Sequence, residues 1–255
     1  MTTTSTIRTQ AERADQTRGR ILDAAIHEFS ENGLAGARTD QIAEAAGVNK
    51  ALLYYYFKGK DALYGAALAA VAQQVVGSGL AVMELDCSAG ERLLHFALNH
   101  FDRIHSQRPF QSLMQQEMIR LHRGEENALT PIVETVFKPM MVRFREVYAE
   151  GKQTGELITV DEMQIMYAGL GANVFYFLSA PVVDMMTGRD PFEPTALEHR
   201  RRAAIEYLGQ TIFTDRQHGA EAAGLVLERT PMPRNGTTFK RVMKTREVRE
   251  DERTQ

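Results

Sequence analysis

Residues 20–63 read RILDAAIHEFSENGLAGARTDQIAEAAGVNKALLYYYFKGKDAL, and this stretch decides the fold. Three short helical patterns follow one another here, and only Gly47 and Val48 separate the second pattern from the third. Gly47 suits the left-handed backbone conformation that reverses a chain between two helices. A helix as short as the third cannot bury a core alone, so it must pack on its neighbours. The pattern predicts a helix-turn-helix unit, in which one helix braces another that can enter a groove of DNA.

Local signals place the boundaries of these helices. The first helix is expected over residues 17–32, with its apolar residues on one stripe, and Gly33 is placed to end it. The second helix begins at Arg38 or Thr39. Asn49 is a good N-cap for the third helix, because its side-chain oxygen can accept a bond from an amide of the first turn.

The bulk composition fits a soluble globular protein. The chain has 255 residues, of which 44% are hydrophobic and 25% charged, enough for one or two domains. The formal net charge is −3, so attraction to DNA must come from a local basic face. Cys87 is the one cysteine, which excludes an intrachain disulfide and a multi-thiolate metal site. Because residues 1–20 lack an apolar segment, we expect no signal peptide. A single cysteine fits the reducing cytoplasm, and no pattern of residues indicates a metal or a cofactor, so we expect neither.

One uncharged stretch, Ile165–Val183, is long enough to span a membrane. Acidic residues flank it on both sides, whereas spanning helices usually show a bias of Lys and Arg on one flank. Pro181 would also interrupt the helix near its end. We therefore expect no membrane insertion. A helix that is buried between its own domain and a partner subunit explains the same composition.

No alternation with the period of a strand persists along the chain, so the predicted fold class is all-α. The expected organisation is a flexible arm at residues 1–15 and a three-helix helix-turn-helix domain at 16–62. A helical ligand-binding and dimerisation domain follows at 63–215. After it, the periodicity fades, and residues 216–255 are expected to form a disordered tail.

The third helix of the unit presents two different faces. Successive residues on a helix rotate by roughly 100°, so three consecutive tyrosines cannot all point inward. Leu53 and Phe57 share an apolar side that is expected to pack on the first two helices. The other side offers an ammonium group, a small residue and two phenols: Lys50, Ala51, Tyr54 and Tyr55. Such groups can bond phosphates and approach base edges, so we expect DNA contact here; the alternative is aromatic core packing.

Three further residues flank this face, in addition to Asn49 at the start of the third helix. Arg38 and Thr39, at the start of the second helix, can bond the DNA backbone or a base, and Thr39 is equally suited to cap the helix. Lys60 follows a tight turn near the amino end of the fourth helix, where amide groups and a lysine both favour a phosphate. The predicted DNA-binding residues are therefore Arg38, Thr39, Asn49, Lys50, Ala51, Tyr54, Tyr55 and Lys60.

This segment resembles the N-terminal domain of the TetR family of bacterial transcriptional regulators. The matching residues are 21–25, Phe29, Gly33, 42–48, 53–57 and Lys60, about a fifth of the chain. Four positions depart from the family's usual pattern. Asn49 replaces a serine cap, Ala51 replaces the commonest glycine, and Tyr55-Tyr56 replaces a frequent pair that contains histidine. These departures bear on which DNA sequence is read.

The resemblance implies a homodimer in which the last two long helices of each subunit form a four-helix interface. The sequence supplies two suitable segments, at about 161–180 and 195–213, and Ala168, Gly169, Gly171 and Ala172 would permit close backbone approach. Two symmetric reading units imply a pseudo-palindromic operator in double-stranded DNA.

The resemblance also implies a cavity for a small-molecule effector among the middle helices. Methionines and aromatic residues there supply an adaptable apolar lining, although an ordinary helical core has the same composition. A few polar side chains among them could orient a ligand. The candidate ligand-binding residues are Asn99, Gln115, Met118, Met140, Phe144, Tyr167, Asn173 and Tyr176.

No pattern of catalytic residues is visible, so an enzyme is not expected. His95, His100 and His105 recur at a spacing of five, which rotates successive rings away from one another. The sequence contains no H-E-x-x-H, G-x-S-x-G or P-loop motif. The leading interpretation is a dimeric repressor that a largely apolar effector releases from its operator. The alternatives are a helical small-molecule-binding protein or enzyme, and an architectural DNA binder without an effector.

Overall fold

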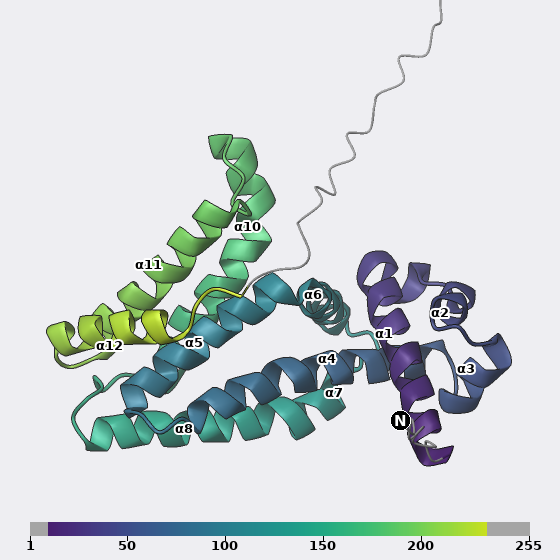
Figure 1. Cartoon of the computed structure of the whole chain (residues 1–255), viewed down its shortest axis with the longest axis horizontal. Helices are drawn as coiled ribbons and strands as arrows, with labels where there is room; N and C mark the ends of the chain where they lie inside the picture. The colour runs from purple at the N-terminus through teal and green to yellow at the C-terminus, as the bar shows by residue number, and fades with distance from the viewer. Residues whose placement is uncertain (1–9, 234–255) are drawn as a thin grey trace, which may run out of the picture.

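The computed structural model describes residues 10–233, and within that range the chain is helical (Figure 1). No β-strand occurs there apart from one isolated bridge between Leu157 and Phe213, so the predicted all-α fold is confirmed. The helices are α1 (Gln10–Gly36), α2 (Thr39–Ala45), α3 (Lys50–Tyr56), α4 (Lys60–Met83), α5 (Ala89–Ser106), α6 (Arg108–His122), α7 (Leu129–Ile132), α8 (Lys138–Gln153), α9 (Glu162–Met166), α10 (Ala172–Thr187), α11 (Pro194–Ile212) and α12 (Arg216–Arg229), with π-helical turns η1 (Val133–Phe137) and η2 (Tyr167–Gly171).

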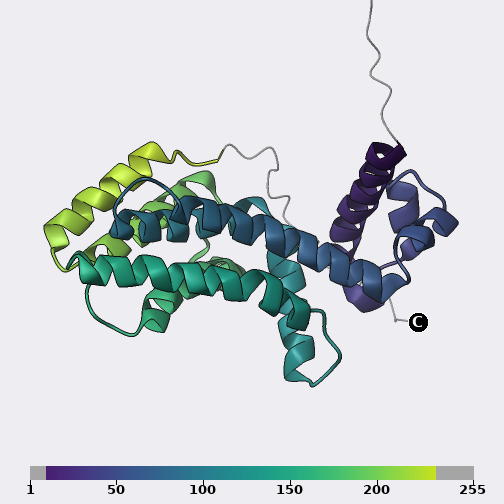
Figure 2. The same ribbon diagram turned by 90° about the horizontal axis from the view of Figure 1, so that it is seen from below.

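Helices α1, α2 and α3 form a reading head at one end of the molecule (Figures 1 and 2). Its core contains Ile21, Phe29, Ile42 and Leu53, all fully buried, together with the first half of α4. Burial of large apolar side chains of this kind is what stabilises short helices that have little intrinsic stability. The expected apolar stripe of the first helix is therefore confirmed as the centre of the head.

Helices α4 to α12 form the body. Helix α4 runs from the head into the body, where α8 lies beside it and α5 packs on both (Figure 2). Helix α6 crosses back to the head: the Ser112 hydroxyl donates to the carbonyl of Ser30 in α1, at 2.8 Å. A second apolar core joins α5 and α8 to the last two helices. Head and body are thus connected through α4 and through α6.

Proline marks the start of α8. Proline lacks an amide hydrogen and clashes with the preceding turn, which predicts a bend or a restart of the helix at Pro139. The π-helical turn Val133–Phe137 ends directly before α8, and Pro139 stands in the first turn of that helix. A π-helical turn is a known place for a kink, so the predicted restart is confirmed.

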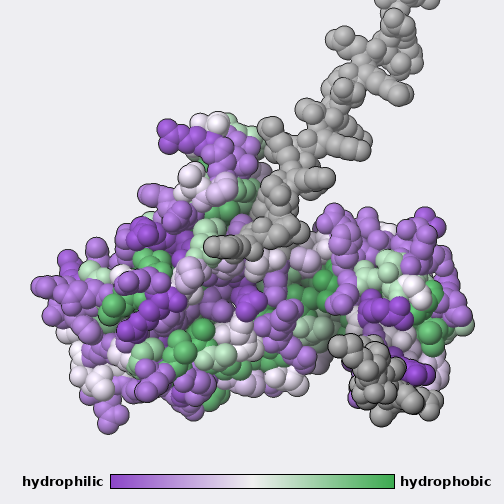
Figure 3. All heavy atoms as spheres, viewed as in Figure 1, coloured by the Kyte–Doolittle hydropathy of each residue, from purple (hydrophilic) through white to green (hydrophobic). Residues whose placement is uncertain are grey.

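Helices α10 and α11 form an arm that projects from the body (Figure 1). Figure 3 shows both hydrophobic and hydrophilic residues exposed on this arm. Two helical stretches of the described residues, Lys60–Met83 and Glu162–Thr187, are long and apolar enough to cross a membrane by length and composition. The first has ten buried residues, eight of which belong to the two apolar cores described above. The second is less buried, but Asn173 on its inner side donates to the carbonyl of Ala97.

Both ends of the described chain differ from the prediction. Helix α1 begins at Gln10, so residues 10–15 are helical instead of forming a flexible arm. The predicted arm at residues 1–9 lies outside the described residues. The prediction of a disordered tail from residue 216 was wrong for Arg216–Arg229, which form α12. Residues 234–255 of that predicted tail also lie outside the described residues.

Small side chains explain why α12 was missed. Its buried residues are Gly219, Ala222, Ala223 and Val226, which recur at helical spacing but contribute little hydrophobic signal. Gly219 packs so closely on Gly209 of α11 that a Cβ on either would collide with the other's carbonyl group. Tertiary packing therefore stabilises a helix that composition alone does not predict.

Candidate DNA-binding interface

The turn between α2 and α3 has the predicted local geometry. Gly47 adopts φ 65°, in the left-handed region that favours glycine. The amide of Val48 donates to the carbonyl of Ala43 at 2.9 Å, which closes the turn. Asn49 caps α3, because its side-chain oxygen accepts a bond from the amide of Leu52 at 2.8 Å. The predicted cap is therefore confirmed, and its geometry fixes where α3 begins.

Helix α3 has one buried and one exposed side. Leu53 is fully buried and Phe57 nearly so, as the sequence predicts. Tyr54 is 41% exposed and Tyr55 is 80% exposed, and Lys50 and Ala51 are exposed too. The four residues that we expect to contact DNA therefore share the outer surface of the head. A water-exposed surface of phenols, an ammonium group and a small residue can bind a polyanion and approach base edges.

Thr39 and Tyr54 face each other across the two helices. Their hydroxyl oxygens lie 3.2 Å apart, within hydrogen-bond distance, and Thr39 is buried. The N-cap of α2 is Arg38, and Thr39 is the first residue of the helix, so the expectation that Thr39 caps it was wrong. Arg38 is exposed, and its backbone amide donates to the carboxylate of Glu28 in α1 at 2.9 Å. Its guanidinium group remains on the outer surface beside the predicted contacts.

An ion pair that the sequence analysis missed joins α2 to α3. Lys50 Nζ lies 2.8 Å from Asp40 Oδ1. The hydrogen bond and the positive charge of Lys50 lower the pKa of Asp40, and Asp40 in turn raises the pKa of Lys50. Both groups therefore stay ionised at neutral pH. The spacing of ten residues gives no hint of the pair, because the angle between α2 and α3 decides whether the side chains meet.

Other basic residues lie around the head. Lys60 Nζ donates to the carbonyl of Ala35 at 3.1 Å, so this predicted phosphate contact also ties α4 to the end of α1. Arg18 stands 5.6 Å above the centre of the Phe57 ring, a distance typical of a cation–π contact. Arg20 Nη1 lies 3.4 Å from the position that a Cβ at Gly47 would take. Arg18 and Arg20 thus lie beside α3 and the turn, although they were not among the predicted contacts.

The eight candidate ligand-binding residues do not meet in one cavity. Phe144 and Met140 pack in the apolar cores, whereas Met118 and Tyr167 are exposed. Tyr176 is half-buried, and its hydroxyl donates to the carbonyl of Pro191. The prediction of a shared ligand site for these residues was therefore wrong in its geometry.

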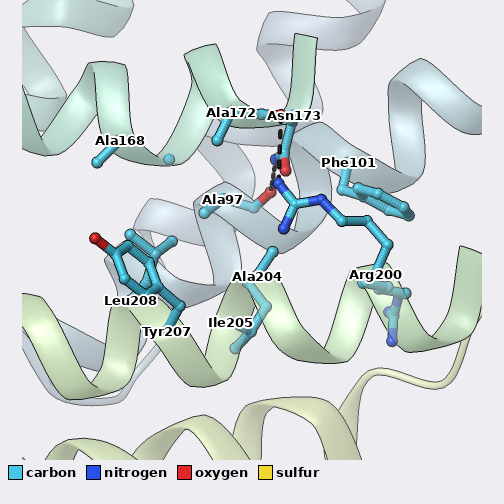
Figure 4. Close-up of a pocket in the computed structure, with 12 residues that line it drawn as sticks. Ala97, Phe101, Ala168, Ala172, Asn173, Arg200, Ala204, Ile205, Tyr207 and Leu208 are labelled. Carbon is cyan, nitrogen blue, oxygen red and sulfur yellow. Dashed lines mark hydrogen bonds between the residues drawn. The ribbon is translucent and has the colours of Figure 1, made fainter. Parts of the chain in front are cut away.

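The remaining three candidates line three separate hollows. Asn99 lines a cleft of about 380 Å³ between α4, α5 and the end of α12. Gln115 lines a groove of about 300 Å³ between α5, α6 and α10. Asn173 lines a cavity of about 70 Å³ between α5, α10 and α11 (Figure 4), where it donates to Ala97 at 3.0 Å and Arg200 donates to Ala172 at 3.3 Å. Only the first two hollows reach the size of a ligand pocket.

The histidines and the cysteine stand apart from these features. Among the described residues, no group of three or more His, Cys, Asp or Glu side chains could hold a metal ion. Burial lowers the pKa of His100 to about 4, so this ring is neutral at physiological pH. Burial also raises the pKa of Cys87, which reduces its thiolate fraction and with it its reactivity.

Comparison with known families identifies the class. Residues 21–67 match the model of the bacterial regulatory proteins of the tetR family. Residues 90–208 match the model of the tetracyclin repressor-like C-terminal domain. The first model covers most of the head, and the second covers most of the body. The chain therefore belongs to the TetR family of bacterial transcriptional regulators, as its resemblance predicted.

Curated relatives resemble this chain in the head. The transcriptional repressor NicS of Pseudomonas putida is 44% identical over 55 residues, which are 22% of this chain and 26% of NicS. The transcriptional regulator RutR of Escherichia coli is 56% identical over 48 residues, 19% of this chain and 23% of RutR. The chain thus matches about a quarter of the length of these relatives.

Solved structures resemble it over a longer range. A TetR-family regulator from Marinobacter aquaeolei has a TM-score of 0.59 at 19% identity, covering 76% of this chain and 96% of that one. The gamma-butyrolactone receptor (ArpA-like protein) has a TM-score of 0.57 at 19% identity, covering 86% and 100%. At 19% identity, the likeness shows that this chain and the two solved structures share a fold.

Proposed function

We propose that this protein is a dimeric repressor that binds a pseudo-palindromic operator and leaves it when a small, largely apolar molecule binds. One observation carries the DNA-binding part: Lys50, Tyr54 and Tyr55 project outward from a helix whose other side is buried. This surface stands at the outer end of the molecule, where a duplex can approach it (Figure 2). The protein acts by binding, and we place it in the cytoplasm, where its DNA lies.

Selection from a pool of random duplexes tests DNA binding. The wild-type protein should enrich a sequence with two related half-sites, because a two-fold symmetric dimer presents two heads. The dissociation constants for the enriched duplex and for random duplex are then compared at moderate ionic strength. Equal affinity for the two would contradict the proposal.

A second copy of the chain is the partner that we propose for the arm. Apolar residues form one stripe along the outer side of η2 and α10, and a stripe this long is unfavourable in water. Its members are Tyr167, Val174, Phe175, Leu178, Val182, Met185 and Met186. Gly171 lies on the same side and permits close approach of a second backbone. Two such stripes packed together with the α11 helices would bury this surface and place the two heads symmetrically.

The groove between α5, α6 and α10 is the effector site that we propose. Its walls are aliphatic and aromatic side chains such as Ile104 and Phe177, with Gln111, Ser112 and Gln115 along α6. Among the side chains that the structure describes, none that lines this groove is charged, which favours a neutral and largely apolar ligand. Ser112 both lines the groove and donates to the Ser30 carbonyl in α1. A ligand against α6 would therefore act directly on a contact between body and head.

A thermal-shift screen of neutral one-ring and two-ring aromatic compounds tests this site. A compound that binds the folded state raises the melting temperature, and an effector must also weaken operator binding. Gln115→Leu should reduce the melting-temperature shift, because it removes a polar group of the groove. Ser112→Ala should retain ligand binding and reduce its effect on operator affinity. A compound that raises the melting temperature of Gln115→Leu as much as that of wild type would show that the effector site lies elsewhere.

A further inference from the structure

Two neighbouring residues of α2 hold two of the predicted contact residues of α3. The carboxylate of Asp40 lies 2.8 Å from the ammonium group of Lys50, and both side chains are about half exposed, at 58% and 49%. Beside this pair, the hydroxyl oxygens of Thr39 and Tyr54 lie 3.2 Å apart. The ion pair therefore lies on the outer surface of the head, at the place where a duplex would dock.

The pair matters because the head has little positive charge. Across residues 10–62, acidic side chains slightly outnumber basic ones. Affinity for any duplex comes from cations that neutralise phosphates and release counterions, so the availability of each cation counts. While Lys50 is paired with Asp40, its charge is compensated. If Lys50 left, the bare carboxylate of Asp40 would repel the phosphates nearby.

We propose that Asp40 is a specificity-determining residue, which releases Lys50 to a DNA phosphate only where a base offers Asp40 another donor. The inference rests on the proposed DNA-binding function. In the major groove, the suitable donors are the exocyclic amino groups N4 of cytosine and N6 of adenine. On a duplex that places such a group opposite Asp40, the ion pair opens and Lys50 gains a phosphate. On other duplexes the pair stays closed, because opening it would leave the Asp40 carboxylate without a donor beside the phosphates.

The surroundings of the pair allow this exchange. Ala51, next to Lys50, is exposed and small, so the start of α3 can approach the base edges closely. Asp40 is within hydrogen-bond distance of Lys50 and is exposed, so its carboxylate lies on the surface that would face the same groove. An ion pair this exposed contributes little to folding. Removal of Asp40 should therefore leave the head folded and change DNA binding alone.

The test compares wild type with Asp40→Ala on two probes, the duplex that the wild type enriches and a random duplex of equal length. Without Asp40, Lys50 can bind any phosphate, so the affinity for random duplex should rise by about fivefold at moderate salt. The slope of log K against log salt on random duplex should steepen by about 0.9 for each Lys50 that gains a phosphate. The affinity for the enriched duplex should change by less than about twofold, because Lys50 is already bound to a phosphate there. Asp40→Ala loses the contact of Asp40 with the base but also removes the repulsion between its carboxylate and the phosphates, and these two effects oppose each other.

Glu31→Ala is the matched control, because it removes one exposed acidic charge of the head from α1 and leaves the ion pair of Asp40 and Lys50 in place. It should leave the salt slope on random duplex unchanged. A double variant adds Lys50→Ala to Asp40→Ala, and there the steepening must disappear, since no ammonium group remains to gain a phosphate. A second selection with Asp40→Ala should enrich half-sites that have lost the preference at one base pair.

The outcomes separate the two proposals. If the wild type shows no preference for any duplex, the DNA-binding function fails and the role of Asp40 fails with it. If the wild type enriches an operator but Asp40→Ala leaves both the salt slope and the selected half-site unchanged, the role of Asp40 alone is wrong. Circular dichroism melting of each variant checks that the fold is intact. A melting temperature of Asp40→Ala far below that of wild type, with no gain in affinity for random duplex, would assign Asp40 to structure and overturn the proposal.

Discussion

At the scale of single residues, neighbours hold most of the exposed contact groups of the head. Asp40 holds Lys50, Thr39 holds Tyr54, and Lys60 bonds the end of α1. Side chains that are ordered before binding lose less entropy when they bind. The contacts of Asp40 and Thr39 also decide whether Lys50 and Tyr54 are free to bind DNA. Residues of α2 therefore influence which groups α3 can offer to a duplex.

Tyr54→Phe tests a single hydroxyl of this surface. The ring keeps its packing, and the lost hydrogen bond to a phosphate is worth about 1 kcal/mol, so the dissociation constant for the operator should rise roughly fivefold. Fluorescence anisotropy with the enriched duplex measures it. Thr154→Val removes an exposed hydroxyl at the end of α8, outside both the head and the arm, so it is the control and should bind like wild type. An unchanged dissociation constant for Tyr54→Phe would show that this hydroxyl does not contact DNA.

His100 should make the stability of the protein depend on pH. Burial lowers its pKa to about 4 in the folded protein, and its Nδ1 has no hydrogen-bond partner among the described residues. The unfolded chain, with an ordinary pKa of about 6.5, binds the proton more readily, so protonation favours unfolding. Above about pH 6.5, His100 is neutral in both states and does not reduce the free energy of unfolding. As the pH falls from about 6.5 towards 4, the free energy of unfolding decreases by at most about 1.4 kcal/mol per pH unit.

Melting curves of wild type and His100→Gln between pH 4 and pH 7 measure this effect. Glutamine does not titrate, so the variant should lose less stability than wild type as the pH falls. Parallel curves for the two proteins would show that His100 does not contribute to the pH dependence.

At the scale of elements, close packing of α11 on α12 requires glycine. A Cβ at Gly209 would collide with the backbone carbonyl of Gly219, which cannot move away as a flexible side chain can. The second core depends on this approach, because Ala222, Ala223 and Val226 of α12 belong to it. Helix α12 lies beyond the segment that matches the C-terminal family model, yet it is part of the same core.

Gly209→Ala should therefore lower the free energy of unfolding by roughly 1–3 kcal/mol, the usual cost of an overpacked site. Gly224→Ala is the matched control on α12, where a Cβ meets nothing within 4 Å. That change should stabilise the protein by roughly 0.5–1 kcal/mol, because alanine loses less entropy in a helix. Urea titrations of both variants measure the difference. Equal stability of the two would mean that α11 and α12 can move apart at no cost.

At the scale of the whole molecule, the proposed dimer must hold its two heads at a fixed distance, and the arm is the surface that we propose for this. Phe175 lies in the middle of its apolar stripe and is 67% exposed in the single chain. A charge placed there could not be buried against a second copy without a large desolvation cost. Phe175→Glu should therefore give a monomer that binds a half-site weakly.

Light scattering after size-exclusion chromatography measures the mass of each form. Leu121→Glu is the control, since it introduces the same charge at an exposed leucine of α6, outside the stripe. It should remain a dimer. A dimeric Phe175→Glu protein would show that another surface joins the subunits.

Much of the reading head could be predicted from sequence because its signals are local. The turn at Gly47, the cap at Asn49 and the two sides of α3 depend on residues a few positions apart. The ligand-binding residues could not be predicted in the same way. Their hollows lie between helices that are far apart in the chain, so the eight candidates are divided between cores, exposed surfaces and three separate hollows.

The sequence by itself determined the helical class, the helix-turn-helix unit and the exposed side of its third helix, because periodicity and backbone preference act within a few residues. Tertiary structure alone decided that Asp40 pairs with Lys50 and that Ser112 links the groove to the head. It also decided that a run of glycine and alanine becomes α12. Each of these depends on the distance and angle between two helices, which are set by the packing of the whole core.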